Sequence, residues 1–242
     1  MNNTIVRTVM ALVALAGGMA TASEPAARPL RVLFIGSSLT YQNGLPDRFL
    51  ALVRQYEDRP VEVAEATLAA SGLGRHWDGR GRTRVKEGGW DYVVLQQGFD
   101  VVPTSKYPRL FDEEIRKVGA KTVLFVTWGY RGNKARQREL NEAFASVARE
   151  LGVMAAPVGP AWELAEARLP GIGLYHPDDL HPSTLGTYLA ACVFYSTIFN
   201  KPLPTEDASG PTKAAHEAAW EAVQSWRTGV QQFEDARRLP RS

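Results

Sequence analysis

Two short segments of the chain carry side chains suited to nucleophilic catalysis. Ser38 follows the apolar run 31–35, and a hydroxyl at such a strand-to-helix turn lies where a helix N-terminus stabilises developing negative charge. Far downstream, Asp178 and His181 are three residues apart. On a tight turn this spacing lets the carboxylate hold one imidazole nitrogen while the other nitrogen accepts a hydroxyl proton. Together the three side chains favour acyl transfer through a serine nucleophile.

Both segments also have simpler interpretations. The string 36–38, Gly-Ser-Ser, is common in turns and helix caps. The segment around Asp178 can be an Asx turn ahead of a helix, with His181 as a surface residue. A third interpretation is a divalent metal site made of His176, Asp178, Asp179 and His181. These four side chains lie on one short loop, whereas a mononuclear site usually recruits ligands from elsewhere in the chain, so we expect no metal.

Short apolar runs alternate with amphipathic stretches from Arg31 onward. The apolar, β-branched runs predict strands over residues 31–35, 61–63, 90–95, 121–126 and 153–157. Apolar residues at three-to-four spacing predict helices over residues 45–56, 108–118, 133–151, 161–168, 185–200 and 212–238. Strands that alternate with helices indicate βαβ units. We therefore expect a single-domain three-layer α/β/α sandwich around a central parallel five-stranded sheet.

Ligand sites in open parallel sheets lie beyond the carboxyl ends of the strands. This rule selects residues 36–40, 69–77, 96–100 and 128–131. Within these segments Trp128 and Tyr130 are candidate substrate-binding residues, although either can instead cover the sheet edge. His76 and Trp77 fit a cap or core role at least as well as substrate contact.

Composition places the chain in a broad class. It has 242 residues, of which 45% are apolar and 22% charged, with a formal net charge of +2. This is the composition of a soluble globular domain, and the charge predicts neither a nucleic-acid partner nor a polybasic membrane patch. Cys192 is the only cysteine, so no intrachain disulfide forms. Its apolar context predicts a buried core position rather than a nucleophile.

The N-terminal residues predict a targeting segment. Arg7, an apolar stretch and a small-x-small string at 20–22 are typical of a secretory signal peptide over residues 1–22; the alternative is an N-terminal membrane anchor. The remaining divisions are residues 23–30 as a linker, 31–200 as the catalytic domain, and 201–242 as a linker and a C-terminal helix that packs on the same domain. We therefore expect export to the periplasm or the medium, without stable membrane insertion once the signal is removed.

Two strings together resemble a known family. Residues 35–40, Ile-Gly-Ser-Ser-Leu-Thr, resemble the Gly-Asp-Ser-Leu signature after strand one of SGNH (GDSL-like) hydrolases, with Ser37 in place of the Asp. Asp178 and His181 resemble the C-terminal catalytic block of that family, and the likeness continues through residues 182–190. The order of these strings and their positions on the expected strands make the resemblance specific, and it spans about residues 31–200.

The resemblance also predicts an oxyanion hole. The family is described by a series of short sequence blocks. Residues 70–73 are similar to its second block, in which a glycine, here Gly72, supplies a backbone N–H to the oxyanion. The third block usually supplies an Asn side chain, but here the third strand ends in Gln96-Gln97-Gly98. It looks instead like subgroups with a glutamine there, such as sialate O-acetylesterase-like proteins. A glutamine amide donates the same hydrogen bond; the register leaves Gln96 and Gln97 both open, and the Gln-Gly pair favours Gln97.

The resemblance implies a flavodoxin-like fold and a serine esterase with Ser38, Asp178 and His181 as catalytic residues. Backbone N–H groups of Ser38 and Gly72 then join a glutamine amide in holding the oxyanion, and no cofactor is needed. We expect small acyl esters, above all acetyl esters on carbohydrate, as substrates. Short-chain lipid or aryl esters are one alternative, and a non-catalytic glycan-binding module is another. The α/β-hydrolase family fits poorly, because its Gly-x-Ser-x-Gly elbow requires glycine where position 40 is Thr.

Overall fold

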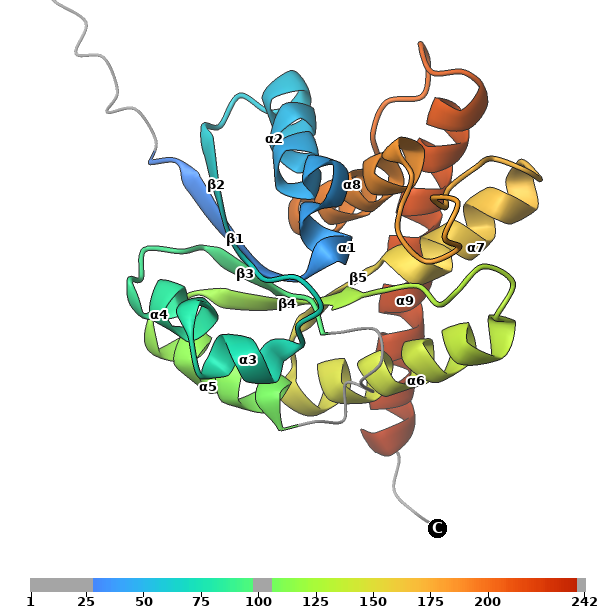
Figure 1. Cartoon of the computed structure of the whole chain (residues 1–242). Coiled ribbons are helices and arrows are strands. Elements are labelled where there is room, and N and C mark those ends of the chain that lie inside the picture. Colours follow the sequence, from blue (N-terminus) through green and yellow to red (C-terminus); the bar gives the residue numbers. More distant parts are fainter. Residues whose placement is uncertain (1–27, 98–105, 239–242) are drawn as a thin grey trace, which may run out of the picture.

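The computed structural model describes residues 28–97 and 106–238, with side chains through residue 229. Within these ranges five strands form one parallel sheet in the order β2-β1-β3-β4-β5 (Figure 1). The strands are β1 (Leu30–Gly36), β2 (Val61–Thr67), β3 (Tyr92–Leu95), β4 (Lys121–Val126) and β5 (Met154–Pro157). The expected α/β sandwich with a parallel five-stranded sheet is confirmed.

Helices cover both faces of this sheet (Figure 1). One face carries α2 (Leu45–Tyr56), α7 (Val158–Arg168), α8 (Thr184–Phe199) and α9 (Gly210–Arg238). The other carries α3 (Leu73–Trp77), α4 (Arg80–Lys86), α5 (Tyr107–Lys117) and α6 (Lys134–Leu151). A short helix, α1 (Ser38–Tyr41), and a 3-10 turn (Gln42–Gly44) lead from β1 into α2.

The central strands are apolar throughout because both of their faces are covered. Val32 and Phe34 of β1 point into one core cluster, and Leu33 and Ile35 point into the other, all four fully buried. Phe34 meets Phe194 of α8 edge-to-face, with ring centroids 5.3 Å apart. The edge strand β2 is more polar, which explains why only its first residues read as a strand from sequence.

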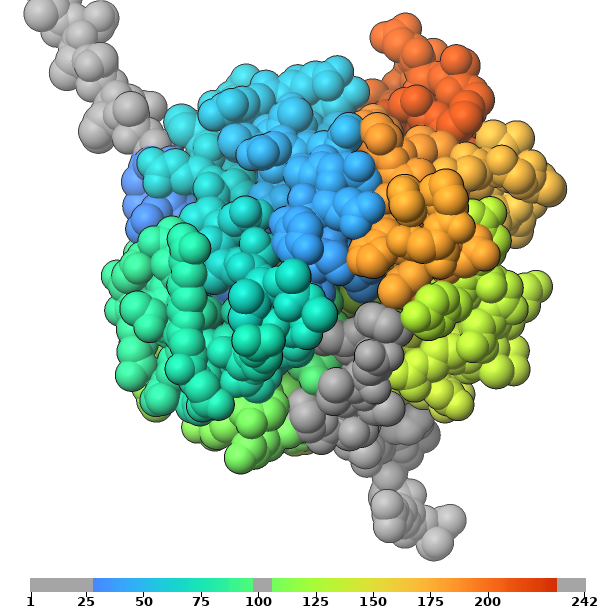
Figure 2. Space-filling view, in the orientation of Figure 1, coloured from blue at the N-terminus to red at the C-terminus, as the bar shows by residue number. Residues whose placement is uncertain are grey.

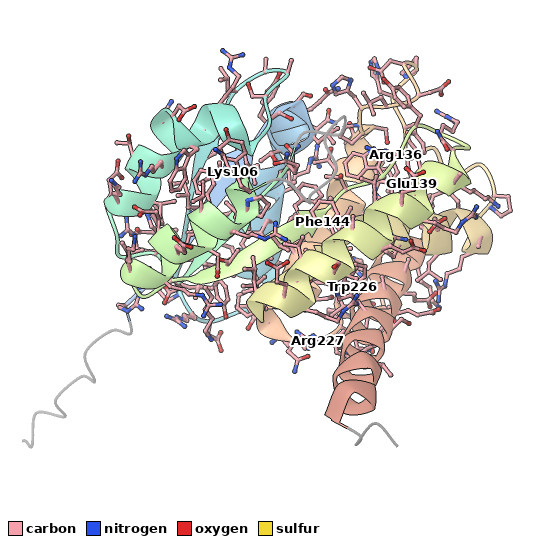
Figure 3. All side chains as sticks on the ribbon, turned by 90° about the horizontal axis from the view of Figure 1, so that it is seen from below. Lys106, Arg136, Glu139, Phe144, Trp226 and Arg227 are labelled. Atoms are coloured by element: carbon pink, nitrogen blue, oxygen red, sulfur yellow. The ribbon has the colours of Figure 1, made fainter. Side chains whose placement is uncertain are left out.

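Helices α6 and α8 differ in how much of their surface is buried. Figure 3 shows Arg136 and Glu139 on the outer side of α6, where their side chains form an ion pair at 3.1 Å. Phe144 on the same helix is buried against the sheet. Helix α8 is buried nearly all round, and burial raises the pKa of the Cys192 thiol within it. The expectation that Cys192 belongs to the core is confirmed.

Some expectations differ from the structure or fall outside the described residues. The two short helices α3 and α4 were not predicted, because five and seven residues are too few to show an amphipathic period. The segment 1–22, expected to be a signal peptide, and most of the expected linker 23–30 lie outside the described residues. In the described ranges, every helix is too short or too polar to serve as a membrane span.

Candidate active site

Ser38 begins α1, directly beyond the carboxyl end of β1. The turn that places it depends on Gly36, because a Cβ at that position would lie 2.6 Å from Gln96 Oε1 and closer still to the Thr40 hydroxyl. Ser37 precedes the helix in extended conformation, and its carbonyl accepts the N–H groups of Thr40 and Tyr41. The Ser38 side chain is thereby held at the C-terminal edge of the sheet, where ligand sites of such folds lie.

Ser38, His181 and Asp178 form a continuous hydrogen-bonded chain. His181 Nε2 lies 2.9 Å from Ser38 Oγ, although the two residues are 143 positions apart in the sequence. His181 Nδ1 lies 2.8 Å from Asp178 Oδ2. Donation of the Nδ1 proton to the carboxylate leaves Nε2 as the acceptor for the Ser38 hydroxyl. The structure therefore brings together the three side chains that sequence reasoning singled out, in the geometry of a nucleophile, a base and an orienting acid.

The Asp178 carboxylate is held by its own loop. Backbone N–H groups of Leu180 and His181 donate to Oδ1 at 3.0 and 2.8 Å. These bonds, the Leu180 one most of all, together with the imidazole of His181, hold the pKa of Asp178 well below its usual range. A second imidazole also reaches Oδ2, since His176 Nδ1 lies 3.2 Å away. Asp178 thus stays ionised at neutral pH, as a group that stabilises an imidazolium must.

The loop after β4 contacts the loop of residues 176–181, here called the catalytic loop, which carries Asp178 and His181. The indole N–H of Trp128 donates to Leu180 O at 2.8 Å. Arg131 donates its backbone N–H to Asp179 O at 2.9 Å, and its guanidinium pairs with the Asp179 carboxylate at 2.6 Å. Asp179 has a positive φ of 59°, a strained conformation that these two contacts help to hold. None of these supports was expected from the sequence, because all of them join segments about 50 residues apart.

The two aromatic residues suggested as substrate contacts have different environments. Trp128 is only 1% exposed and stacks on Trp162, with ring centroids 4.0 Å apart and planes at 10°. It is part of the core that supports the catalytic loop, so its assignment to the substrate surface is corrected. Tyr130 is 44% exposed at the same edge of the sheet, a position compatible with substrate contact.

Gln96 has a structural environment. It is fully buried, and its amide oxygen accepts the Ser37 backbone N–H at 2.6 Å and the Thr40 hydroxyl at 3.1 Å. Its amide nitrogen donates to Gln97 O at 2.7 Å. The oxygen of the Gln96 amide therefore holds the turn that presents Ser38, and its nitrogen is engaged with the carbonyl of the next residue, which favours a structural role.

Gln97 is oriented differently. Its Oε1 accepts the Leu73 backbone N–H at 3.3 Å, while the described residues offer no acceptor to its Nε2. The backbone N–H groups of Ser38 and Gly72 likewise donate to no acceptor within the described ranges. The Leu73 bond ties the Gly72 turn to the end of β3, which is the neighbour of β1 in the sheet. Three unengaged donors thus belong to segments that follow β1, β2 and β3 at the sheet edge where Ser38 lies, as donors of an oxyanion hole would have to.

His76 is buried, and Trp77 is partly buried against the core. His76 is 3% exposed and its Nε2 lies 2.9 Å from Gly36 O, so a neutral imidazole donates to the last carbonyl of β1. Burial lowers the pKa of this histidine, and nearby Arg75 lowers it further. Trp77 packs edge-to-face on Phe111 at 5.3 Å. The structure thus favours the core interpretation for both residues.

The metal interpretation finds no geometric support in the described ranges. There, no group of three or more His, Cys, Asp and Glu side chains is arranged to hold a metal ion. Asp179, one of the four candidate ligands, turns its carboxylate to Arg131 instead.

Comparison with known proteins identifies the fold. No family model and no curated protein matches the sequence. Among solved structures, a DUF4886 family protein from Bacteroides uniformis is similar at TM-score 0.64 and 18% identity, over 81% of this chain and 95% of that one. A lipase/acylhydrolase from Enterococcus faecalis follows at TM-score 0.56 and 17% identity, over 72% and 99%. An acetylxylan esterase from Geobacillus stearothermophilus has TM-score 0.54 and 16% identity, over 70% and 94%.

The chain shares its fold with this lipase/acylhydrolase and this acetylxylan esterase. At these identities the likeness concerns the fold, and it extends over nearly the whole length of each neighbour. It agrees with the SGNH resemblance of the sequence, whereas the placement in a subgroup with glutamine in the third block stays a prediction.

Proposed function

We propose that this protein is a serine esterase that hydrolyses small acyl esters with Ser38 as nucleophile. The observation that carries the proposal is the chain of hydrogen bonds from Asp178 through His181 to Ser38, at 2.8 and 2.9 Å, at the C-terminal edge of the sheet. A serine turn alone, or an Asp-His pair alone, occurs in many proteins for local structural reasons. Their meeting across 143 residues has no such local explanation.

The reaction follows from this geometry. Ser38 Oγ forms a bond to the ester carbonyl carbon as its proton passes to His181 Nε2. The tetrahedral oxyanion is held by the backbone N–H groups of Ser38 and Gly72 and by the Gln97 amide. Its collapse breaks the bond to the alcohol, which leaves with the proton from His181. Water then attacks the acyl-enzyme, His181 takes and returns a proton in the same way, and the free acid departs.

The ionised Asp178 has two roles in this scheme. Because it accepts the Nδ1 proton of His181, it selects the tautomer whose Nε2 can act as a base. Because its pKa is held low by the Leu180 N–H and by His181, it keeps its charge when the imidazole becomes positive. No step of this mechanism calls for a metal ion or an organic cofactor.

The substrate class we propose is acetyl esters on carbohydrate. It is supported by the third-block glutamine and by the likeness in fold to an acetylxylan esterase. Short-chain lipid or aryl esters are the alternative, supported by the neighbour named lipase/acylhydrolase. We further propose that the protein is exported, on the signal-like pattern of residues 1–22.

A fluorophosphonate probe tests the proposal most directly. The purified chain should hydrolyse p-nitrophenyl acetate and take up the probe on Ser38, as located by peptide mass spectrometry. Ser38→Ala should abolish both reactions while the thermal midpoint changes little, because the hydroxyl is partly exposed and contributes little to packing. Ser37→Ala is the matched control: it should still be labelled on Ser38. Absence of hydrolysis and of labelling in the wild type would instead favour a non-catalytic glycan-binding module.

A further inference from the structure

A cavity of about 240 Å³ lies beside the catalytic loop and does not include the triad. Its wall combines aromatic and charged side chains: Tyr130, Lys134, Trp162, Glu163, Glu166 and Tyr175. They come from the loop after β4, the start of α6, the α7 helix and the segment that leads to Asp178. Figure 2 shows the orange segment around residue 175 next to the yellow-green segment that begins α6.

The cavity and Ser38 share one edge of the sheet. The wall segment after β4 leaves the sheet two strands away from β1, which places the two strand ends about 10 Å apart. Tyr175 connects the two sites, because its hydroxyl donates to Gly129 O at 3.2 Å and its backbone bridges to Pro182, next to His181. A ligand longer than one sugar ring can therefore occupy the cavity while one of its ester groups lies at Ser38.

Charged side chains of both signs line the cavity. Glu163 is exposed and Glu166 is half-buried, and partial burial raises the pKa of both carboxylates. Lys134 interacts with both carboxylates, and Arg131 interacts with Glu166. The N-terminus of α6, at Lys134, adds positive potential. The cavity wall therefore offers two carboxylate acceptors and one ammonium donor, which suits a ligand with several hydroxyl groups.

Trp162 supplies a further observation on the same wall. Its indole N–H is buried and has no hydrogen-bond partner among the described residues. Buried polar groups are seldom left unpaired, because each loses its bond to water on folding. The N–H is covered by neighbouring atoms rather than facing the open cavity, so a ligand oxygen reaches it only if the side chains around it shift.

We propose that this cavity binds the sugar portion of an acetylated oligosaccharide while the acetyl group is attacked at Ser38. This inference rests on the proposed function and names a recognition site for its substrate. Hydroxyl groups of the bound sugar donate to Glu163 and Glu166 and accept from Lys134. The cavity selects substrates by the alcohol part of the ester. Hydrolysis of a p-nitrophenyl ester, which has no sugar, therefore does not depend on the cavity.

Two substrates compared on the same variants test the inference. We would measure kcat/KM on acetylated xylo-oligosaccharides and on p-nitrophenyl acetate, and follow the ratio of the two. Glu166→Gln and Glu163→Gln should each lower this ratio about tenfold, mainly through KM on the oligosaccharide, because a neutral amide accepts a weaker hydrogen bond than a carboxylate. The control is Glu142→Gln, an exposed residue of α6 outside the cavity, which should leave the ratio unchanged.

The outcomes separate the inference from the proposed function. If the wild type hydrolyses p-nitrophenyl acetate but not the oligosaccharide, or if both glutamate variants keep the wild-type ratio, the cavity is not a sugar site. If the wild type hydrolyses neither ester and Ser38 is not labelled, the esterase proposal itself fails. Calorimetric titration of unacetylated xylo-oligosaccharide into Ser38→Ala then measures binding at the cavity without catalysis. Equal affinity in Ser38→Ala and in the double variant Ser38→Ala/Glu166→Gln would overturn the inference.

Discussion

The indole N–H of Trp128 and the carbonyl oxygen of Leu180 form a 2.8 Å hydrogen bond that joins the end of β4 to the catalytic loop. Leu180 lies between Asp178 and His181, so this bond acts on the peptide that sets the spacing of the acid and the base. Its donor is buried and stacked on Trp162, and is therefore rigid. The position of the His181 imidazole thus depends on a residue that touches no substrate.

Trp128→Phe should lower kcat on p-nitrophenyl acetate several-fold while KM changes little. The variant keeps a stacking ring but loses the donor to Leu180, and a lost buried hydrogen bond costs about 1–3 kcal/mol of stability. Trp162→Phe is a matched control, because it removes an indole N–H that has no partner in the described ranges. Steady-state kinetics and thermal melts of both variants distinguish loss of the hydrogen bond from loss of ring packing. An equal loss of kcat in the two would assign the effect to ring packing rather than to the hydrogen bond.

His181→Ala and His176→Ala should differ strongly in activity. Both imidazoles reach the same oxygen of Asp178, at 2.8 and 3.2 Å, but only His181 also contacts Ser38. Loss of the base should lower kcat by about 10⁴-fold or more. Loss of His176 should cost less than about tenfold, since Asp178 keeps its two backbone hydrogen bonds. Comparable losses in both variants would show that the proton is not taken by His181 alone.

The two glutamines should separate into a kinetic and a structural role. Gln97→Ala should lower kcat by about 10²–10³ with little change in KM, because its amide donates to charge that exists only in the transition state. Gln96→Ala should instead lower the thermal midpoint, because the Ser37 N–H and the Thr40 hydroxyl lose their shared acceptor. Kinetics and melts of both single variants test this. Near-normal kcat in Gln97→Ala would remove that residue from the oxyanion hole.

Acid should destabilise the protein partly through His76. Burial lowers the pKa of this residue in the folded state below its usual value of 6.5. As the pH falls below 6.5, the histidine of the unfolded chain binds a proton while that of the folded chain does not. The free energy of unfolding therefore decreases below this pH and is unaffected by His76 above it. His76→Gln keeps a donor for Gly36 O but does not titrate. Its free energy of urea unfolding should therefore fall less between pH 7 and pH 5 than that of the wild type. An identical fall would assign the acid sensitivity to other groups.

Local patterns in the sequence were enough for much of the architecture. The bounds of β4 and α2 agree with the expected ranges 121–126 and 45–56, because a fully apolar run and a regular amphipathic period each reflect local burial. The Asp178 and His181 pair was also readable, since three residues on one tight turn bring the two side chains together. Such features depend on neighbours along the chain, and the amino-acid sequence displays them directly.

Tertiary structure decided the features that depend on packing between distant elements. The contact of His181 with Ser38 requires the sheet to bring two segments 143 residues apart to one edge. Gln96 and Gln97 have separate environments because side chains of adjacent residues at a strand end point in opposite directions. A shift of one residue in the register of the strand would exchange these two directions. The support of the catalytic loop by Trp128 has the same origin. Hydrogen bonds between elements are set by how those elements pack, and no local period of the sequence records that.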